Sequence, residues 1–179
     1  MSLFLSMCRS GHGEIQVFSP LVSPEDNPIT QEKVELGRKL FFDKRLSINE
    51  TVACATCHVP EFAFTDRKSV SEGVFGRVTE RNSPTLLNAG YLPVVMFDAH
   101  LTSLEMQVIV PIQEHVEMDM KMGDLIARLA KIEEYQNAAR IIFNRDFDPY
   151  VLTRSISAFQ RTLISSNSRF DQFYYGKNQ

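Results

Sequence analysis

The sequence predicts an all-α domain with long loops. Apolar residues recur at helical spacing in several segments, whereas the alternation of apolar and polar residues that is typical of strands is rare. One long segment, residues 60–84, is polar and contains glycine, which indicates a loop. A chain of 179 residues is long enough to bury one sizeable core. A loop of this length inside one compact domain usually serves a function.

The first part of the chain, residues 1–29, is predicted to be an extended N-terminal arm or the remnant of a leader. Glycines and prolines are frequent between residues 9 and 29, which disfavours regular structure. The first eight residues faintly resemble the end of a lipoprotein signal, but they lack a basic start, and Met7 is bulky where a small residue is expected. Cys8 is therefore predicted to be a free thiol in this arm. The folded domain is predicted to cover residues 30–179.

The first helix is predicted over residues 31–42. Thr30 is a suitable N-cap, and Glu32 places a negative charge in the first turn. The apolar residues behind this start share roughly one helical face, and they are Val34, Leu36, Leu40 and Phe41. A second, short helix is predicted around residues 54–58, before the long loop.

Four further helices are predicted in the second half of the chain. Ser103 is a suitable cap for a helix through Leu104, Val108 and Ile109 that ends near Pro111. Apolar residues at helical spacing indicate the other three helices. The first contains Leu125, Ile126, Leu129 and Ile132, behind Gly123 and Asp124. The second contains Ala138, Ile141, Ile142 and Phe143, and the third contains Val151, Leu152, Ile156, Phe159, Leu163 and Ile164.

Composition excludes several classes of protein. The formal net charge of −3 shows no basic excess, which argues against a nucleic-acid partner. The longest apolar runs are far too short to span a bilayer, so no transmembrane span is predicted. Three cysteines are too few, and odd in number, for a disulfide framework.

Five consecutive residues, Cys54-Ala55-Thr56-Cys57-His58, carry the strongest chemical signal in the chain. On a helix, cysteines at this spacing present both sulfurs to the same side, one turn apart. Each thiol can then form a thioether with one vinyl group of a haem. His58 follows directly, so its imidazole can bind the iron from the same side. The C-x-x-C-H pattern therefore predicts one covalently attached haem c.

Two other interpretations of the cysteine pair are weaker. A zinc site needs four ligands, commonly with a second Cys/His pair at similar spacing, and His12, His100 and His115 form no such pair. A thioredoxin-like dithiol would lie beside a βαβ pattern, and the sequence shows none.

Further blocks around this motif resemble the N-terminal half of the bacterial di-haem cytochrome c peroxidase and MauG superfamily. The resemblance covers about residues 24–175, and the order and spacing of the blocks fit as well as their letters. The blocks are residues 36–43 (LGRKLFFD), 45–47 (RLS), 63–66 (AFTD), 81–86 (RNSPTL), 103–107 (SLEMQ), 111–112 (PI), 117–118 (EM), 158–163 (AFQRTL) and 167–171 (NSRFD).

This resemblance implies a cytochrome c-like fold and a peroxidase-type oxidoreductase. Family members have two such domains, of which the N-terminal haem reacts with hydrogen peroxide and the C-terminal haem supplies electrons. The sequence has one C-x-x-C-H motif, so the resemblance implies an N-terminal domain without its second haem domain. The electron donor would be that domain or a small cytochrome or cupredoxin. The resemblance also allows the protein to form a homodimer. Because c-type haem is attached outside the cytoplasm, the protein is expected to be periplasmic or otherwise exported.

The resemblance also assigns roles to individual residues. His58 would be the proximal iron ligand, and Glu117 matches the distal glutamate that moves a proton during peroxide cleavage. Arg81 could contact a haem propionate, since a guanidinium pairs well with a carboxylate, or it could be a plain surface arginine. Asn82 matches one ligand of an inter-domain calcium site. Since calcium needs six to eight oxygens and most would come from the second domain, no stable calcium site is expected in this chain alone.

One block departs from the family pattern. The family usually has F-W-D-G-R where this chain has Met96-Phe97-Asp98-Ala99-His100. Phe97 replaces the tryptophan between the two haems, and phenylalanine is hard to oxidise, which weakens the expected electron route. His100 could be a buried polar residue, a distal ligand or an exposed side chain.

The loop at residues 69–76 contains no histidine, although peroxidases that need reductive activation use a histidine there to block the iron. Either the iron is permanently open, as in the MauG-like branch, or another side chain binds it. The side chains near Glu117 in sequence that could do so are His115, Met118, Met120 and Met122. A methionine ligand would favour electron transfer, but methionines in an all-α chain more often pack in the core or in loops.

Two functional hypotheses remain open. The first is an enzyme domain that reduces hydrogen peroxide, with Glu117 on an otherwise open distal side. The second is a mono-haem, cytochrome c-like electron-transfer module, in which a methionine or histidine closes the iron.

Overall fold

The computed structural model describes residues 20–176, so Cys8 and the first nineteen residues of the predicted arm or leader remnant lie outside the described residues. The chain divides into a main unit, Leu21–Ile164, and a second unit that contains the described residues 165–176. The helices of the main unit are α1 (Gln31–Phe41), α2 (Cys54–Cys57), α3 (Leu104–Gln107), α4 (Ile109–Gln113), α5 (Met122–Leu129), α6 (Glu133–Phe143) and α7 (Pro149–Arg161); the second unit contains α8 (Arg169–Tyr175).

The all-α fold with long loops is confirmed for the described residues. They contain no extended strand, but three isolated β-bridges join Val59 to Thr65, Glu72 to Val78, and Val95 to Leu101. Short 3₁₀ turns are η1 (Lys44–Leu46), η2 (Pro60–Phe62), η3 (Val74–Gly76) and η4 (Ala89–Tyr91). The loop predicted over residues 60–84 contains no α-helix and continues to Ser103. No helix in residues 20–176 is long and apolar enough to cross a bilayer.

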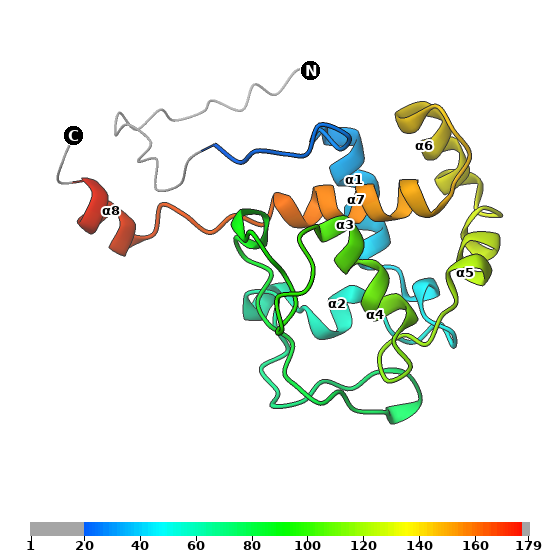
Figure 1. Ribbon diagram of the computed structural model, residues 1–179, viewed down its shortest axis with the longest axis horizontal. Coiled ribbons are helices and arrows are strands. Elements are labelled where there is room, and N and C mark those ends of the chain that lie inside the picture. Colours follow the sequence, from blue (N-terminus) through cyan, green and yellow to red (C-terminus); the bar gives the residue numbers. More distant parts are fainter. Residues whose placement is uncertain (1–19, 177–179) are drawn as a thin grey trace, which may run out of the picture. The chain divides into compact units, whose positions relative to one another are not determined.

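Helices α1 and α7 pack against each other and form the centre of the main unit (Figure 1). Leu40 and Phe41 of α1 and Ile156 of α7 are fully buried in one hydrophobic core. The rings of Phe41 and Phe159 lie 5.1 Å apart and connect the two helices. Burial of large apolar side chains is the main favourable contribution to folding, at about 1.5–3 kcal/mol for each. The pairing of α1 with α7 therefore supports the loops that carry the candidate site.

Gly37 allows this close crossing. A Cβ atom at Gly37 would lie 1.8 Å from the carbonyl oxygen of Ser155 on α7, which is far below any allowed contact. The backbone of α7 cannot move away without opening the core, so only glycine fits at this position of α1.

We expect Gly37→Ala to destabilise the main unit by about 3 kcal/mol, because the added methyl group forces the two helices apart. The matched control is Gly123→Ala on α5, where an added Cβ would meet no atom within 4 Å. That control should change stability by less than about 1 kcal/mol. Urea unfolding of both variants measures the difference, and equal stabilities for the two would contradict this account of the crossing.

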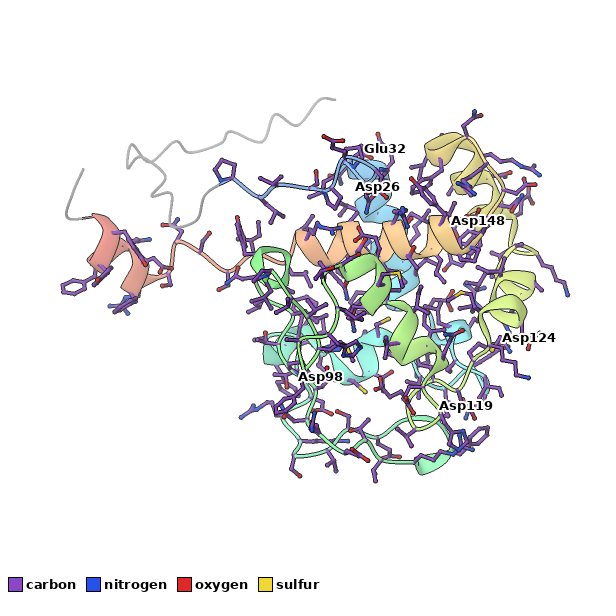
Figure 2. All side chains as sticks on the ribbon, viewed as in Figure 1. Asp26, Glu32, Asp98, Asp119, Asp124 and Asp148 are labelled. Carbon is purple, nitrogen blue, oxygen red and sulfur yellow. The ribbon has the colours of Figure 1, made fainter. Side chains whose placement is uncertain are left out.

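Side chains cap several helices as local rules require. The Thr30 hydroxyl accepts a hydrogen bond from the backbone N–H of Lys33, and the Ser103 hydroxyl accepts one from Met106, so both predicted N-caps are confirmed. Asp148 caps α7 in the same way (Figure 2).

Several predicted helix boundaries were wrong. Pro111 does not end its helix, because α4 starts again after Val108 and places Pro111 in its first turn, where no backbone N–H is needed. Helix α7 ends at Arg161, before Leu163 and Ile164.

Helix α6 begins at Glu133, earlier than the predicted start, because Tyr135 and Ala139 supply its buried face. Ile141, one of the apolar residues that indicated this helix, is 82% exposed. Helix α8 was not predicted; it has a capping box formed by Ser168 and Asp171.

A buried polar network joins three distant parts of the main unit. The Glu105 carboxylate on α3 accepts hydrogen bonds from Asn27, from the Ser157 hydroxyl and from both terminal nitrogens of Arg161. Asn27 lies in the segment predicted as an extended arm, yet its side chain is fully buried. These bonds hold the lead-in to α1 against α3 and α7.

Candidate functional site

Helix α2 places the two cysteines of the C-x-x-C-H motif one turn apart. The turn is closed by a hydrogen bond from the His58 backbone N–H to the Cys54 carbonyl oxygen (2.9 Å). At its start, the Thr56 hydroxyl accepts a hydrogen bond from the Ala53 backbone N–H (2.9 Å). Both Cys54 and Cys57 are free thiols, half-buried. The C-x-x-C spacing alone therefore places the two thiols one helical turn apart, as predicted.

Hydrogen bonds orient the His58 imidazole. Its Nδ1 lies 2.9 Å from the carbonyl oxygen of Phe64, and because a carbonyl can only accept, the proton is on Nδ1. The lone pair is therefore on Nε2, which has a long contact of 3.4 Å with the Ser83 hydroxyl. Burial lowers the pKa of His58 and favours the neutral ring. A neutral imidazole that is oriented through its other nitrogen is the usual state of a metal-binding histidine.

Glu117 lies in the loop after α4, close enough to the thiols to affect them. Burial raises the pKa of Cys54 to about 12 and that of Cys57 to about 11, and the Glu117 carboxylate adds to both shifts. Burial, with the nearby charge of Glu114, also raises the pKa of Glu117 above 4.5. The charge of Glu117 therefore acts on both cysteines, although sixty residues separate it from Cys57 in the chain.

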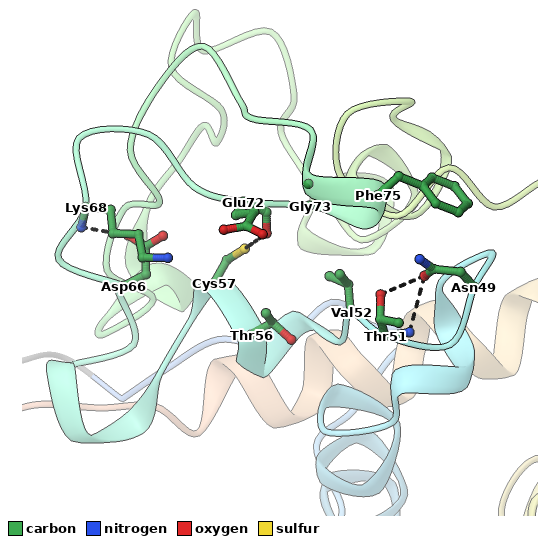
Figure 3. Close-up of a pocket in the computed structure, with 11 residues that line it drawn as sticks. Asn49, Thr51, Val52, Thr56, Cys57, Asp66, Lys68, Glu72, Gly73 and Phe75 are labelled. Atoms are coloured by element: carbon green, nitrogen blue, oxygen red, sulfur yellow. Dashed lines mark hydrogen bonds between the residues drawn. The ribbon is translucent and has the colours of Figure 1, made fainter.

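A cavity of about 470 Å³ opens beside Cys57. Figure 3 shows Gly73 and Phe75 on one side of it and Thr51, Val52 and Thr56 on the other. The Cys57 thiol donates a long hydrogen bond of 3.9 Å to the Glu72 carbonyl oxygen across this space. The remaining lining residues are Asn49, Asp66, Lys68 and Gly76.

The donor set fits a covalently attached haem. Two thiols one turn apart, a neutral imidazole that directly follows them and a cavity beside Cys57 are what this group requires. No cluster of three or more His, Cys, Asp or Glu residues within residues 20–176 could hold a metal ion by itself.

Arg81 and Asn82 are both exposed on the surface. The Arg81 guanidinium stacks 3.8 Å over the ring of Phe97, which is itself 81% exposed. The Asn82 amide makes only a 3.5 Å contact with the Ser83 carbonyl oxygen.

The histidines and methionines proposed as alternative iron ligands lie in two environments. His100 is half-exposed and pairs with Asp98, and His115 is exposed and pairs with Asp119. Of the three options for His100, the structure thus selects the exposed side chain. Met118 and Met120 are buried in the hydrophobic core, and Met122 packs against that core.

Sequence reasoning missed the residues that support Glu117. A Cβ atom at Gly73 would lie 2.0 Å from the Val116 carbonyl oxygen and 2.8 Å from the Glu117 Cα, so this glycine allows two loops to touch. The backbone N–H of Val74 donates to the Glu117 carbonyl oxygen (2.8 Å). The only signal in the sequence was a glycine inside a long polar loop.

The helical fold and its C-x-x-C-H helix define a cytochrome c-like domain. A family model described as di-haem cytochrome c peroxidase matches residues 31–179. The chain belongs to this family. The relatives that match it are named as MauG proteins and as cytochrome c peroxidases.

Three relatives illustrate the likeness. The methylamine utilization protein MauG of Methylophilus methylotrophus is 37% identical over 158 residues, which are 88% of this chain and 47% of that protein. The cytochrome c551 peroxidase of Pseudomonas aeruginosa is 34% identical, over 85% of this chain and 45% of that protein. A crystal structure of a MauG-like protein associated with microbial copper homeostasis superposes with a TM-score of 0.84 at 34% identity, over 92% of this chain and 49% of the other. The chain thus spans about half the length of the curated relatives it matches.

Proposed function

We propose that this chain is the peroxide-reducing haem domain of a di-haem peroxidase. His58 would be the proximal iron ligand, Glu117 the distal acid and base, and a second haem domain the source of electrons. The observation that carries the proposal is the half-buried Glu117, whose backbone contacts Gly73 at the wall of the cavity beside Cys57 and whose pKa is raised by burial. A partly buried carboxyl with a perturbed pKa near a cavity is typical of a group that moves protons.

One haem c would be held by thioethers to Cys54 and Cys57 and by Nε2 of His58. When bound, it supplies the redox-active iron at which peroxide is reduced. The Phe64 carbonyl oxygen fixes the direction of the imidazole through Nδ1. Arg81 would pair with a propionate only after leaving its stack on Phe97.

Glu117 would transfer one proton between the two oxygens of hydrogen peroxide. Its carboxylate accepts the proton from one oxygen and returns it to the other, which leaves as water. Burial supports this role because it brings the pKa of Glu117 closer to neutrality, so that the carboxyl can both accept and release a proton.

The partners follow from the same proposal. Electrons would come from a second haem domain or from a small cytochrome or cupredoxin, and a calcium site that includes Asn82 would need that second domain. A homodimer is a further proposed arrangement, and no nucleic-acid partner is proposed. Export to the periplasm is proposed because c-type haem is attached there.

The distal side distinguishes this enzyme from a mono-haem electron-transfer module, which needs a strong sixth ligand. His100 and His115 are on the surface and bonded to aspartates, which favours the enzyme. We expect the ferric protein to give a high-spin or peroxide-reactive signal in electron paramagnetic resonance and visible spectra. A low-spin histidine–methionine spectrum that does not change with peroxide would reject the proposal.

The cysteine pair gives a direct prediction. We expect the double variant Cys54→Ser, Cys57→Ser to lose all covalently bound haem, because serine hydroxyls do not add to vinyl groups. Haem staining on a denaturing gel measures this loss, and each single variant should keep some stain through one remaining thioether. Cys8→Ser is the control and should stain like the parent, since no histidine follows that cysteine at the required spacing. Full staining of the double variant would contradict the assignment.

A further inference from the structure

One arginine holds both sides of the short loop that carries Glu117. Nη1 of Arg77 donates a hydrogen bond to the His115 carbonyl oxygen (2.8 Å) and another to Oδ2 of Asp119 (2.7 Å). These two residues flank Glu117 at equal distances along the chain. Figure 2 shows Asp119 on the loop that follows α4. A single guanidinium therefore ties the two ends of a five-residue segment whose centre is Glu117.

The backbone around Arg77 touches the same segment. Val74 donates its N–H to the Glu117 carbonyl oxygen, and the close approach at Gly73 leaves no space between the two loops. Gly73 also donates its N–H to the Arg77 carbonyl oxygen (2.8 Å), which closes the turn that presents the guanidinium. The guanidinium lies 4.9 Å from the centre of the Phe75 ring, which limits its freedom. Arg77 and Glu117 thus belong to one connected arrangement of two loops.

We propose that Arg77 is a positioning residue that fixes the direction of the Glu117 carboxyl. The inference rests on the proposed role of Glu117, because a carboxyl that serves two oxygens in turn must keep its place between them. A displacement of about 1 Å in such a group can reduce a rate by about 100-fold. Lysine keeps the charge beside Asp119 but lacks the planar guanidinium that lies against the Phe75 ring, so it replaces this arrangement only in part.

The test compares three variants of the haem-loaded protein in their reaction with hydrogen peroxide. We expect Arg77→Gln to lower the rate constant by about 10- to 100-fold and Arg77→Lys to recover part of that loss. Arg67→Gln is the matched control, since this exposed arginine stacks on Phe62 and should leave the rate unchanged. A parental rate in Arg77→Gln would overturn the inference.

Two further measurements separate positioning from a general loss of structure. In a Glu117→Gln background, Arg77→Gln should cause no additional loss of rate, because its effect passes through Glu117. In the Glu117 parent, hydrogen exchange of the Val74 amide should become faster in Arg77→Gln while the amides of α7 keep their protection. An equal loss of rate in both backgrounds, or unchanged exchange at Val74, would overturn the inference.

The proposed function and this inference can fail separately. If Glu117→Gln is slow but Arg77→Gln reacts at the parental rate, only the positioning role is wrong. If Glu117→Gln itself reacts at the parental rate, the acid–base role is wrong, and any effect of Arg77 cannot pass through Glu117.

Discussion

Replacing Glu117 with glutamine is expected to slow the reaction with hydrogen peroxide by about 10²–10⁴-fold, which is the usual contribution of general acid–base catalysis. Glutamine has nearly the same shape and can still form hydrogen bonds, but it cannot accept and return a proton. Haem staining and the thermal midpoint should stay unchanged, because Glu117 forms no part of the predicted haem attachment. Stopped-flow mixing of the haem-loaded protein with peroxide measures the rate.

The control for this variant is Glu114→Gln, which removes a neighbouring carboxylate that is exposed. Glu114 contributes to the raised pKa of Glu117 but lies nearer the surface, so the rate at neutral pH should stay close to that of the parent. The parental rate should also fall on acidification, since the active carboxylate is lost as the pH drops through a pKa raised above 4.5. Equal rates for Glu117→Gln and the parent would reject the acid–base role.

Replacing Glu105 with alanine is expected to destabilise the main unit by about 3–5 kcal/mol. The substitution leaves the buried Arg161 guanidinium without its carboxylate and removes the acceptor for Asn27 and Ser157. A buried charge without its partner keeps the full cost of its lost hydration. Denaturant unfolding of the haem-loaded protein measures the change.

The matched control is Glu134→Ala, which breaks an ion pair with Lys39 in which both side chains are more than half exposed. That change should cost less than about 1 kcal/mol. If the two substitutions cost the same, the buried network does not stabilise the fold as described.

Glu105 also predicts how stability depends on pH. Its hydrogen bonds and the charge of Arg161 outweigh desolvation and hold the pKa of Glu105 below its usual value of 4.5. Since the folded state binds this proton less readily than the unfolded chain, the contribution is present above pH 4.5 and is lost as the pH falls below it. Unfolding curves of the parent between neutral and acid pH should therefore show a loss that is smaller in Glu105→Gln.

Local features of the chain were predictable because local rules decide them. Thr30 and Ser103 cap helices since their hydroxyls reach a backbone N–H within the same turn. The placement of the Cys54 and Cys57 thiols one turn apart follows from helical spacing alone. The helix of α6 was only partly recognised, because the exposed Ile141 resembles a core residue in sequence while Tyr135 supplies the buried face.

The sequence by itself determined the all-α class, the C-x-x-C-H motif at Cys54, Cys57 and His58, and the family to which the chain is similar. Only the tertiary structure decided that Glu117 lies near the cysteines and that Arg77 holds its loop. The physical reason is the range of the interactions. Spacing within one helical turn sets the motif, whereas the place of Glu117 depends on two loops whose contact is made by backbone atoms, and no local pattern encodes such a contact.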